Sequence, residues 1–309
     1  MRIITIAIIL FAAFFRLSAQ QDVSYSQYMY DKMLINPAYA GSSKWIVGSL
    51  KNRTYVSEIE GVHRTNVFSF QAPWQSKNIG MGLKLVQDKI AVTNRYMMSG
   101  IFSYHIGFGN GRLSFGLEGG IINSHYNYDE LVRIMHDDPA IPLGDQSTII
   151  PDISTGIFYQ NQNFYLGATA YHLLNRKKSW PDYANNQFYK QEKSFYLTGG
   201  YMIEVSRDMI LEPGFLLKYV NGVIPQADVN LSIIMIEKFS AGLSYRTGDA
   251  VLAMFKLDVT KNLKIMYSYD YTLSPLTSYS KGNHEIGISY GIELLPPPAK
   301  KVIHPRYYF

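Results

Sequence analysis

The stretch LKIMYSYDYT, residues 263–272, decides the fold because its side chains alternate in character. Leucine, isoleucine and tyrosine occupy the odd-numbered positions, whereas the even-numbered positions are mostly polar and include Lys264, Ser268 and Asp270. Successive residues of a β-strand point to opposite faces, so this pattern predicts a strand that lies between an apolar and a polar environment. The same period of two recurs at residues 239–246 and 285–292.

Segments of this kind follow one another along the chain and number about 14. Residues 208–219 form the weakest of them, because Pro213 cannot donate a hydrogen bond to a neighbouring strand. About twelve strands therefore remain the alternative. The strands are expected to begin near Trp45, Thr65, Ile79, Tyr96, Gly111, Asp152, Phe164, Ser194, Asp208, Gln226, Lys238, Ala250, Asn262 and Glu285.

The connections between these segments alternate in length. Short connections rich in turn-forming residues lie at residues 107–110, 161–163, 205–207, 236–237 and 260–261. Between them lie long connections, at residues 53–64, 124–151, 174–193 and 273–284, and shorter ones at Asn221 and Gly248. Bacterial outer-membrane barrels have short periplasmic turns and longer outer loops. The chain is therefore expected to be all-β, an antiparallel up-and-down transmembrane β-barrel with both chain ends in the periplasm. A soluble β-sandwich or β-propeller gives no reason for this alternation.

The N-terminus has the three zones of a secretory signal peptide. Met1 and Arg2 precede an apolar run at residues 3–15, and small residues follow up to Ala19. We expect cleavage after Ala19 or Gln20, with a short buried strand or helix as the alternative. The chain then divides into a signal peptide (1–20), an N-terminal plug or cap (21–44), the barrel (45–294) and a periplasmic tail (295–309).

The composition also favours a membrane barrel. Charged residues make up 17% and aromatic residues 14% of the chain, with 25 tyrosines and 24 glycines, as suits strands between lipid and lumen. The absence of cysteine excludes disulfide bonds and thiolate metal sites. The net charge of +5 is scattered, which argues against nucleic acid as a partner. We expect a multi-pass protein of the outer membrane.

Residues 21–44 are too aromatic for a disordered leader and should dock on the barrel. Inside the barrel mouth the segment would bury Tyr28, Met29 and Tyr39, whereas as a cap it would cover the periplasmic rim. Asn36-Pro37 and Gly41 would turn the chain into the first strand.

Polar residues on the expected inner face carry both signs of charge. This mixture favours a crowded or plugged lumen over a wide ion-selective pore, and a solvated wall is the simpler alternative. The set comprises Lys84, Glu118, Glu204, Lys218, Arg246, Lys256, Asp258, Lys264, Asp270 and Glu285.

The tail contains Pro296-Pro297-Pro298, which cannot pair as a strand, and ends in Arg306-Tyr307-Tyr308-Phe309. An extended spacer of about 3.1 Å per residue would carry this end about 30 Å into the periplasm. We expect the end to dock on a periplasmic partner or on the barrel-assembly machinery, with a passive tail as the alternative.

The sequence offers little for catalysis. His136-Asp137-Asp138 could bind a cation, but no second ligand group supports it, and a solvated loop is the simpler interpretation. Ser103 with His105, and Ser124 with His125, are interpreted as ordinary strand residues that cannot form a hydrogen-bonded pair. We expect no enzyme, no catalytic or metal-binding residue and no cofactor.

Two motifs near the N-terminus, Gln27-Tyr28-Met29 and Asn36-Pro37-Ala38-Tyr39-Ala40-Gly41, resemble the opening signature of the PorP/SprF family. The resemblance extends over nearly the whole chain after residue 20, through the blocks at residues 59–61, 69–73, 113–117, 244–251, 269–271 and 282–286. Tyr55-Val56 stands where the family commonly has Gln-Trp, and Lys238-Phe239 where it usually has tryptophan. These departures weaken only the assignment to a subfamily.

The resemblance implies an outer-membrane component of the type IX secretion system of Bacteroidota, needed for export or surface attachment of proteins with C-terminal sorting domains, including gliding adhesins in some members. Implied partners are outer-membrane lipid, periplasmic ring and peptidoglycan-binding components, and the secreted cargo. A fatty-acid-transporter-like channel for hydrophobic solutes is the second hypothesis, and an acylhydrolase or acyltransferase barrel the third. The candidate residues are the signature or plug group (Gln27, Tyr28, Met29, Asn36, Pro37, Ala38, Tyr39, Gly41), the lumen group (Arg246, Asp258, Asp270, Glu285) and the docking group (Arg306, Tyr307, Tyr308, Phe309).

Overall fold

A computed structural model describes residues 22–57, 63–130, 144–175, 177–179, 188–236, 238–274 and 280–294. The expected signal peptide lies outside the described residues. So do the cation candidate His136-Asp137-Asp138 and the docking group Arg306, Tyr307, Tyr308 and Phe309.

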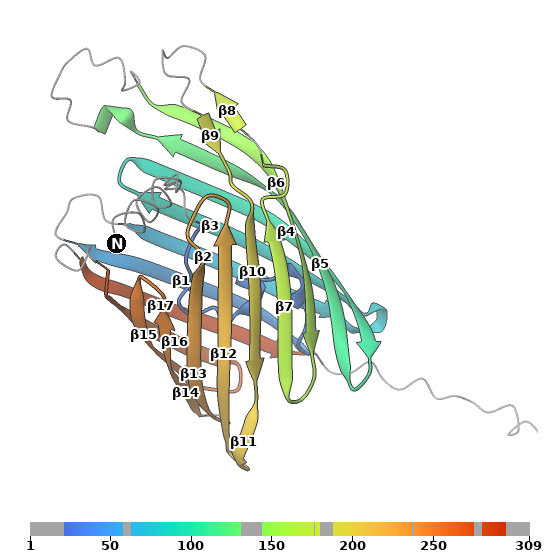
Figure 1. Cartoon of the computed structure of the whole chain (residues 1–309). Coiled ribbons are helices and arrows are strands. Elements are labelled where there is room, and N and C mark those ends of the chain that lie inside the picture. The colour runs from blue at the N-terminus through green and yellow to red at the C-terminus, as the bar shows by residue number, and fades with distance from the viewer. Residues whose placement is uncertain are drawn as a thin grey trace, which may run out of the picture.

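Antiparallel strands build the wall of the molecule (Figure 1). Their bounds are β1 (Trp45–Ser57), β2 (Arg64–Trp74), β3 (Ile79–Ile90), β4 (Thr93–Phe108), β5 (Gly111–Tyr126), β6 (Gln146–Gln160), β7 (Phe164–Tyr171), β10 (Ser194–Tyr201), β11 (Ile203–Ser206), β12 (Met209–Val220), β13 (Gln226–Met235), β14 (Phe239–Arg246), β15 (Ala250–Asp258), β16 (Leu263–Thr272) and β17 (Ser280–Glu293). A separate hairpin pairs β8 (Lys177–Ser179) with β9 (Phe188–Lys190). Short 3-10 helices are η1 (Lys32–Leu34), η2 (Pro37–Tyr39), η3 (Gln75–Lys77) and η4 (Tyr128–Glu130).

The sheet closes on itself. Strands that are neighbours in sequence are neighbours in the wall, and β17 pairs with β1. β10 pairs with β7, from which the hairpin β8–β9 separates it in the chain, and with β12 on its other side. The sheet has 15 strand segments, and β10 with β11 forms one strand interrupted at Met202, so the barrel has 14 strands. Closure leaves no free edge along most of the wall, as a lipid environment requires.

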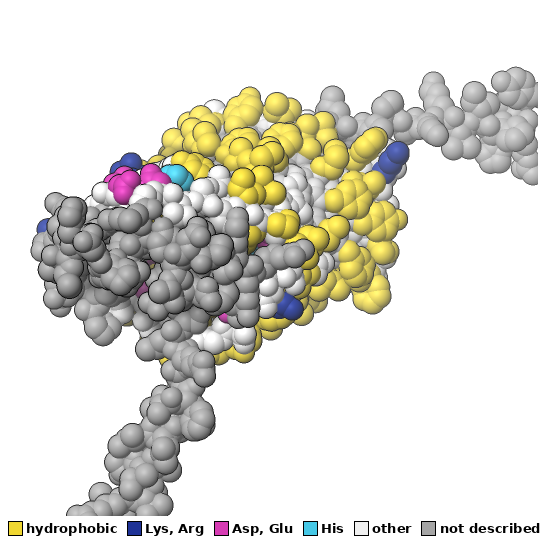
Figure 2. Space-filling model, turned by 90° about the horizontal axis from the view of Figure 1, so that it is seen from above, with side chains coloured by type: hydrophobic (Ala, Val, Ile, Leu, Met, Phe, Trp, Pro, Cys, Tyr) yellow, Lys and Arg dark blue, Asp and Glu magenta, His cyan; other side chains and the backbone are white. Residues whose placement is uncertain are grey.

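Side chains on the outer wall are apolar and those on the inner wall are mostly polar. On β4, Met98 and Phe102 are 55% and 48% exposed, whereas Ser99 and Ser103, which follow them, are buried. Figure 2 shows hydrophobic side chains over most of the visible flank. This band suits lipid acyl chains. In the described part of the chain, no helix is long and apolar enough to cross a membrane.

The expected fold is confirmed, with 14 strands rather than about twelve. Pro213 is accommodated because it faces the interruption at Met202. Pairing with β12 stops at Gly200↔Gly214 and resumes at Ile203↔Leu211, so no neighbour needs the missing N–H at this point.

Three expectations need correction. β6 begins at Gln146 rather than near Asp152, because β5 and β6 remain paired far beyond the barrel rim formed by shorter strands. The alternation of connections is less regular than expected, since Ala91 and Val92 alone join β3 to β4 at the long-loop end. The first described residue, Asp22, does not lie at the periplasmic, short-turn end, because it contacts Ser194 at the opposite end, where β10 begins.

The outer wall provides a test of membrane embedding. Leu243 lies midway along β14 and is 63% exposed, so Leu243→Arg should place a charge in hydrocarbon and lower the free energy of unfolding by about 2–4 kcal/mol. Urea unfolding in lipid vesicles measures this loss. Leu243→Phe is the matched apolar control, and equal stability of the two variants would contradict the proposed lipid contact.

Candidate functional site

The lumen is occupied by residues 22–44, which we call the lumenal segment. This segment runs from the long-loop end to the short-turn end, where Lys44 leads into β1. Its buried apolar side chains contact the wall in several clusters, for example Met29 with Leu216 and Met254, and Leu34 with Val67 and Val86. Of the signature group, Gln27, Tyr28, Met29, Asn36, Pro37, Ala38 and Gly41 are buried, and Tyr39 is half-buried.

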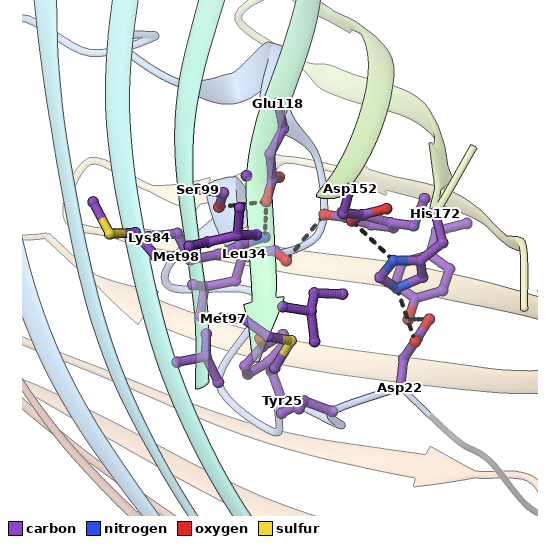
Figure 3. A pocket seen from close by; sticks show the side chains of 17 residues that line it. Asp22, Tyr25, Leu34, Lys84, Met97, Met98, Ser99, Glu118, Asp152 and His172 are labelled. Atoms are coloured by element: carbon purple, nitrogen blue, oxygen red, sulfur yellow. Dashed lines mark hydrogen bonds and ion pairs between the residues drawn. The ribbon is translucent and has the colours of Figure 1, made fainter. Parts of the chain in front are cut away.

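The segment is first held at the long-loop end, by a clasp of Asp22, His172 and Asp152 (Figure 3). The His172 ring contacts Asp152 through Nδ1 at 2.9 Å and Asp22 through Nε2 at 3.0 Å. The hydroxyl of Ser194 also donates to Asp22. Although burial lowers the pKa of His172, hydrogen bonds to the two carboxylates outweigh burial and raise it to about 9. Burial raises the pKa of Asp22, but His172 and Ser194 lower it to about 2.

A second anchor joins the segment to β16 and β17. The Glu285 carboxylate accepts the backbone N–H groups of Ser26 at 2.9 Å and Gln27 at 3.3 Å. The Gln27 side chain donates to the backbone oxygen of Glu285 at 2.7 Å, and the Ser26 hydroxyl donates to Asp270 at 2.7 Å. Arg53 of β1 binds the same Asp270 at 2.8 Å. A short stretch of backbone is thereby fixed by charged acceptors in a buried space.

Arg246 balances the charge of this anchor and is 1% exposed. Its guanidinium donates to Asp228 of β13 at 3.0 to 3.1 Å and lies 3.7 Å from Asp270. A buried guanidinium needs such carboxylate partners because desolvation would otherwise be costly. Arg246, Asp270 and Glu285 therefore act together, as members of one network.

Asp258 does not join that network. It lies at the short-turn end, 3.9 Å from both Lys256 and Lys264, and no contact to the lumenal segment is seen in the described part of the chain. Of two other expected lumen residues near this rim, Glu204 is exposed and Lys264 is half-buried.

Around η2 the wall is adapted to the segment by glycines. Asn36 accepts the N–H of Ala38 at 2.9 Å and donates to the backbone oxygens of Ile157 and Ala168 on β6 and β7. A methyl group at Gly116 would lie 2.1 Å from the amide nitrogen of Ala38, and one at Gly156 would lie 2.2 Å from the side-chain oxygen of Asn36. Only glycine permits so close an approach of two backbones.

One cavity beside the segment, in the described part of the chain, is small. A cavity of about 60 Å³ lies against the ion pair of Lys84 and Glu118, at 2.7 Å, and Ser99 donates to Glu118 at 2.6 Å (Figure 3). Glu118 leaves its other oxygen without a hydrogen-bond partner among the described residues. A cavity of this size accommodates a few water molecules.

The inner wall contains one serine–histidine contact that the sequence interpretation wrongly excluded. Ser103 and His105 are two residues apart, share one face of β4 and lie 3.3 Å apart. However, the Ser103 hydroxyl donates to the backbone oxygen of Ala40 at 2.6 Å, and the other ring nitrogen of His105 contacts Ser114. Ser103 therefore holds the lumenal segment, while His105 links Ser103 to Ser114 of β5. No metal-binding group of three or more His, Asp or Glu side chains occurs in the described ranges.

Comparison with known proteins gives one family match. A family model described as "Type IX secretion system membrane protein PorP/SprF" matches residues 17–290. No curated protein matches. The family and the closed barrel locate the chain in the outer membrane.

Solved structures with similar folds are outer-membrane barrels. The TodX monoaromatic hydrocarbon channel deltaS2 mutant has a TM-score of 0.50 at 11% identity, with 86% of this chain and 94% of that chain covered. A Pseudomonas aeruginosa FadL homologue has a TM-score of 0.47 at 10% identity, covering 84% and 92%. Omp33 of Acinetobacter baumannii has a TM-score of 0.44 at 8% identity, covering 81% and 99%. At these identities the likeness concerns the fold alone.

The close contacts at the wall glycines predict that one added methyl group displaces the lumenal segment. Gly116→Ala should push η2 from the wall, lower the free energy of unfolding by about 1–3 kcal/mol, and speed amide exchange in residues 22–44. The control is Gly119→Ala on the same strand, whose added methyl group would meet no atom within 4 Å. Equal exchange in both variants would contradict the close fit. Hydrogen exchange with urea unfolding measures both effects.

The clasp predicts that the stability of the barrel depends on pH. The pKa of His172 is raised from 6.5 to about 9, so its contribution to stability is complete below pH 6.5 and is lost as the pH rises through 9. The pKa of Asp22 is lowered from 3.8 to about 2, so its contribution is complete above pH 3.8 and is lost as the pH falls through 2. The stability difference between wild type and His172→Gln should therefore shrink between pH 6.5 and 9. A difference that stays constant over this range would contradict the clasp.

Proposed function

The chain belongs to the PorP/SprF family of type IX secretion system membrane proteins, and on this basis we propose that it serves export or surface attachment of proteins with C-terminal sorting domains. In this proposal the barrel is a non-enzymatic scaffold in the outer membrane. Its partners are the periplasmic ring and peptidoglycan-binding components of the secretion system and the cargo itself, with gliding adhesins among the possible cargo.

The strongest support for a scaffold is that charged side chains in the lumen already have partners. Arg53, Arg246, Asp270 and Glu285 are committed to the lumenal segment or to one another. In a conducting pore such groups would face mobile water and solute. A barrel filled by its own chain instead presents its two ends to partners.

The short-turn end provides a surface for periplasmic partners. A groove of about 660 Å³ is lined by Trp74, Arg112, Glu293 and other residues of this rim, including Leu294, where the described chain ends. Lys77 lies over the Trp74 ring at 4.7 Å, so the surface combines aromatic and basic character. We propose that periplasmic components bind here and that Arg306, Tyr307, Tyr308 and Phe309 extend the contact.

A channel for hydrophobic solutes is the second candidate. It is favoured by the apolar part of the cavity wall, formed by Val86, Met97 and Ile122. Purified protein in a planar bilayer separates the two candidates, because steady solute-specific conductance of the wild type would favour the channel.

The secretion role predicts the phenotype of a deletion strain. Removing the gene should abolish surface display or release of at least one protein that carries a sorting domain, and the full-length gene should restore it. Quantitative proteomics of the cell surface and the medium measures both. A complementing gene that lacks residues 296–309 tests the tail separately. Unchanged export of every sorting-domain protein in the deletion strain would reject the proposed role.

A further inference from the structure

Strand β6 has a strand on both sides over less than half of its length. Its pairing with β5 runs from Gln160 up to Gln146, whereas its pairing with β7 stops at Thr155↔Ala170. Above Thr155, no strand in the described part of the chain pairs with this side of β6. Figure 1 shows β6 continuing beyond the end of β7. We call residues 146–153 on this side the open edge.

Specific contacts produce the split between the two strands. His172 follows the last residue of β7 with a φ of 58°, a left-handed conformation that turns the chain away from β6. The next residue, Leu173, donates a backbone hydrogen bond to the oxygen of Ile153 at 2.9 Å. The clasp fixes the His172 ring between Asp152 and Asp22. The open edge is thus bounded below by a defined structure.

The backbone groups on the open edge can be identified from this bond. Because the Ile153 oxygen points away from β5, alternate residues Pro151, Ile149 and Ser147 also direct their backbone groups away from β5. Pro151 has no N–H, and proline in a sheet is typical of an edge. Ile149 and Ser147 retain both N–H and C=O groups. Within the described residues, these groups of Ile149 and Ser147 have no backbone hydrogen-bond partner on this side.

The side chains place the lower part of this edge, around Ile149 and Ile153, at the membrane. Ile149 is 59% exposed and Ile153 is 39% exposed on the outer wall, whereas Thr148 is buried on the inner face. Immediately below, a groove of about 730 Å³ opens on the outer wall between Thr155, Phe195 and Tyr219. Acyl chains can fill the groove but cannot hydrogen-bond to the backbone groups of Ile149, which have no partner on this side among the described residues.

The C-terminal tail and a second copy are poor occupants. A second barrel in the same membrane is related by an axis along the membrane normal, so its tilted β6 would run in the same sense and cross this one instead of pairing antiparallel with it. The C-terminal tail starts at the opposite end, where Leu294 donates to the backbone oxygen of Lys44. A strand of another polypeptide fits the remaining requirements.

We propose that the open edge binds one extended segment of an exported polypeptide, antiparallel to β6. Backbone hydrogen bonds to Ile149 and Ser147 hold the segment, as in other cases of β-strand addition. Its alternate side chains are apolar toward lipid, where the outer groove receives them, and small or polar toward Thr148 and Asp152. This inference rests on the proposed secretion role and assigns the cargo-binding surface to the side of the barrel rather than to its lumen.

A matched pair of variants tests the backbone contact in cells. Ile149→Pro removes the open-edge N–H without touching the ladder to β5, whereas Ile149→Ala removes the same side chain and keeps the N–H. The probe is an epitope-tagged sorting-domain protein whose export is lost in the gene-deletion strain. We expect Ile149→Pro to reduce its export about tenfold and Ile149→Ala to leave it near wild type, since one lost hydrogen bond changes an equilibrium by about this factor.

Heat-modifiable migration in gels confirms that each variant barrel has folded. Wild-type export in both variants, or an equal loss in both, would overturn the inference. If the deletion strain itself still exports every sorting-domain protein, the secretion role fails instead. The two failures are therefore distinguishable.

Cysteine cross-linking provides a measurement that does not require the proline variant to fold, and the native chain contains no cysteine. Ile149→Cys should form disulfides with single cysteines placed along the tagged cargo segment at every second position, as strand pairing requires. The control is Ile121→Cys, because Ile121 is 48% exposed on the outer wall of β5, a strand paired on both sides. Equal cross-linking from both positions, or none from Ile149→Cys during normal export, would overturn the inference.

Discussion

The structure depends on the requirement that backbone N–H and C=O groups find partners where water is absent. A closed antiparallel sheet meets it, and the end-to-end pairing of β1 with β17 and of β10 with β12 supplies that closure. The requirement also explains where irregularities occur. Pro213 is opposite the gap at Met202, and Pro151 is on the open edge, so neither removes a hydrogen bond that a neighbouring strand needs.

Closure creates a second problem, because the inner wall carries charges in a space with little room for water. The lumenal segment solves it with backbone and side-chain groups of its own. Glu285 accepts two N–H groups, Asp270 accepts the Ser26 hydroxyl, and Arg246 lies between Asp228 and Asp270. Wall and segment thus satisfy each other's polar groups, and the glycines at positions 116 and 156 let the backbones approach. Removing either the lumenal segment or its partners on the wall would leave buried polar and charged groups without partners, which is costly.

Local patterns predicted the wall but not the contacts inside it. Alternation at residues 263–272 and 285–292 placed Asp270 and Glu285 on the inner face, because side-chain direction in a strand follows from position alone. It could not indicate that both bind Ser26, since these contacts join positions more than 240 residues apart. Asp22 and His172 gave no signal for the same reason. The glycines at inward positions of β5 and β6 were a signal that could have located the buried segment.

The lumen and the open edge are parts of one network, because Asp152 belongs to both. Its carboxylate points inward to His172, which in turn holds Asp22 at the start of the lumenal segment, while its neighbours Pro151 and Ile153 face the open edge. A strand that pairs with β6 would lie directly beside this clasp. If binding there favours one position of His172, then the position of the lumenal segment must affect binding by the same free energy, since such coupling is reciprocal. The clasp is therefore the element through which a filled lumen can influence what the barrel holds at its side.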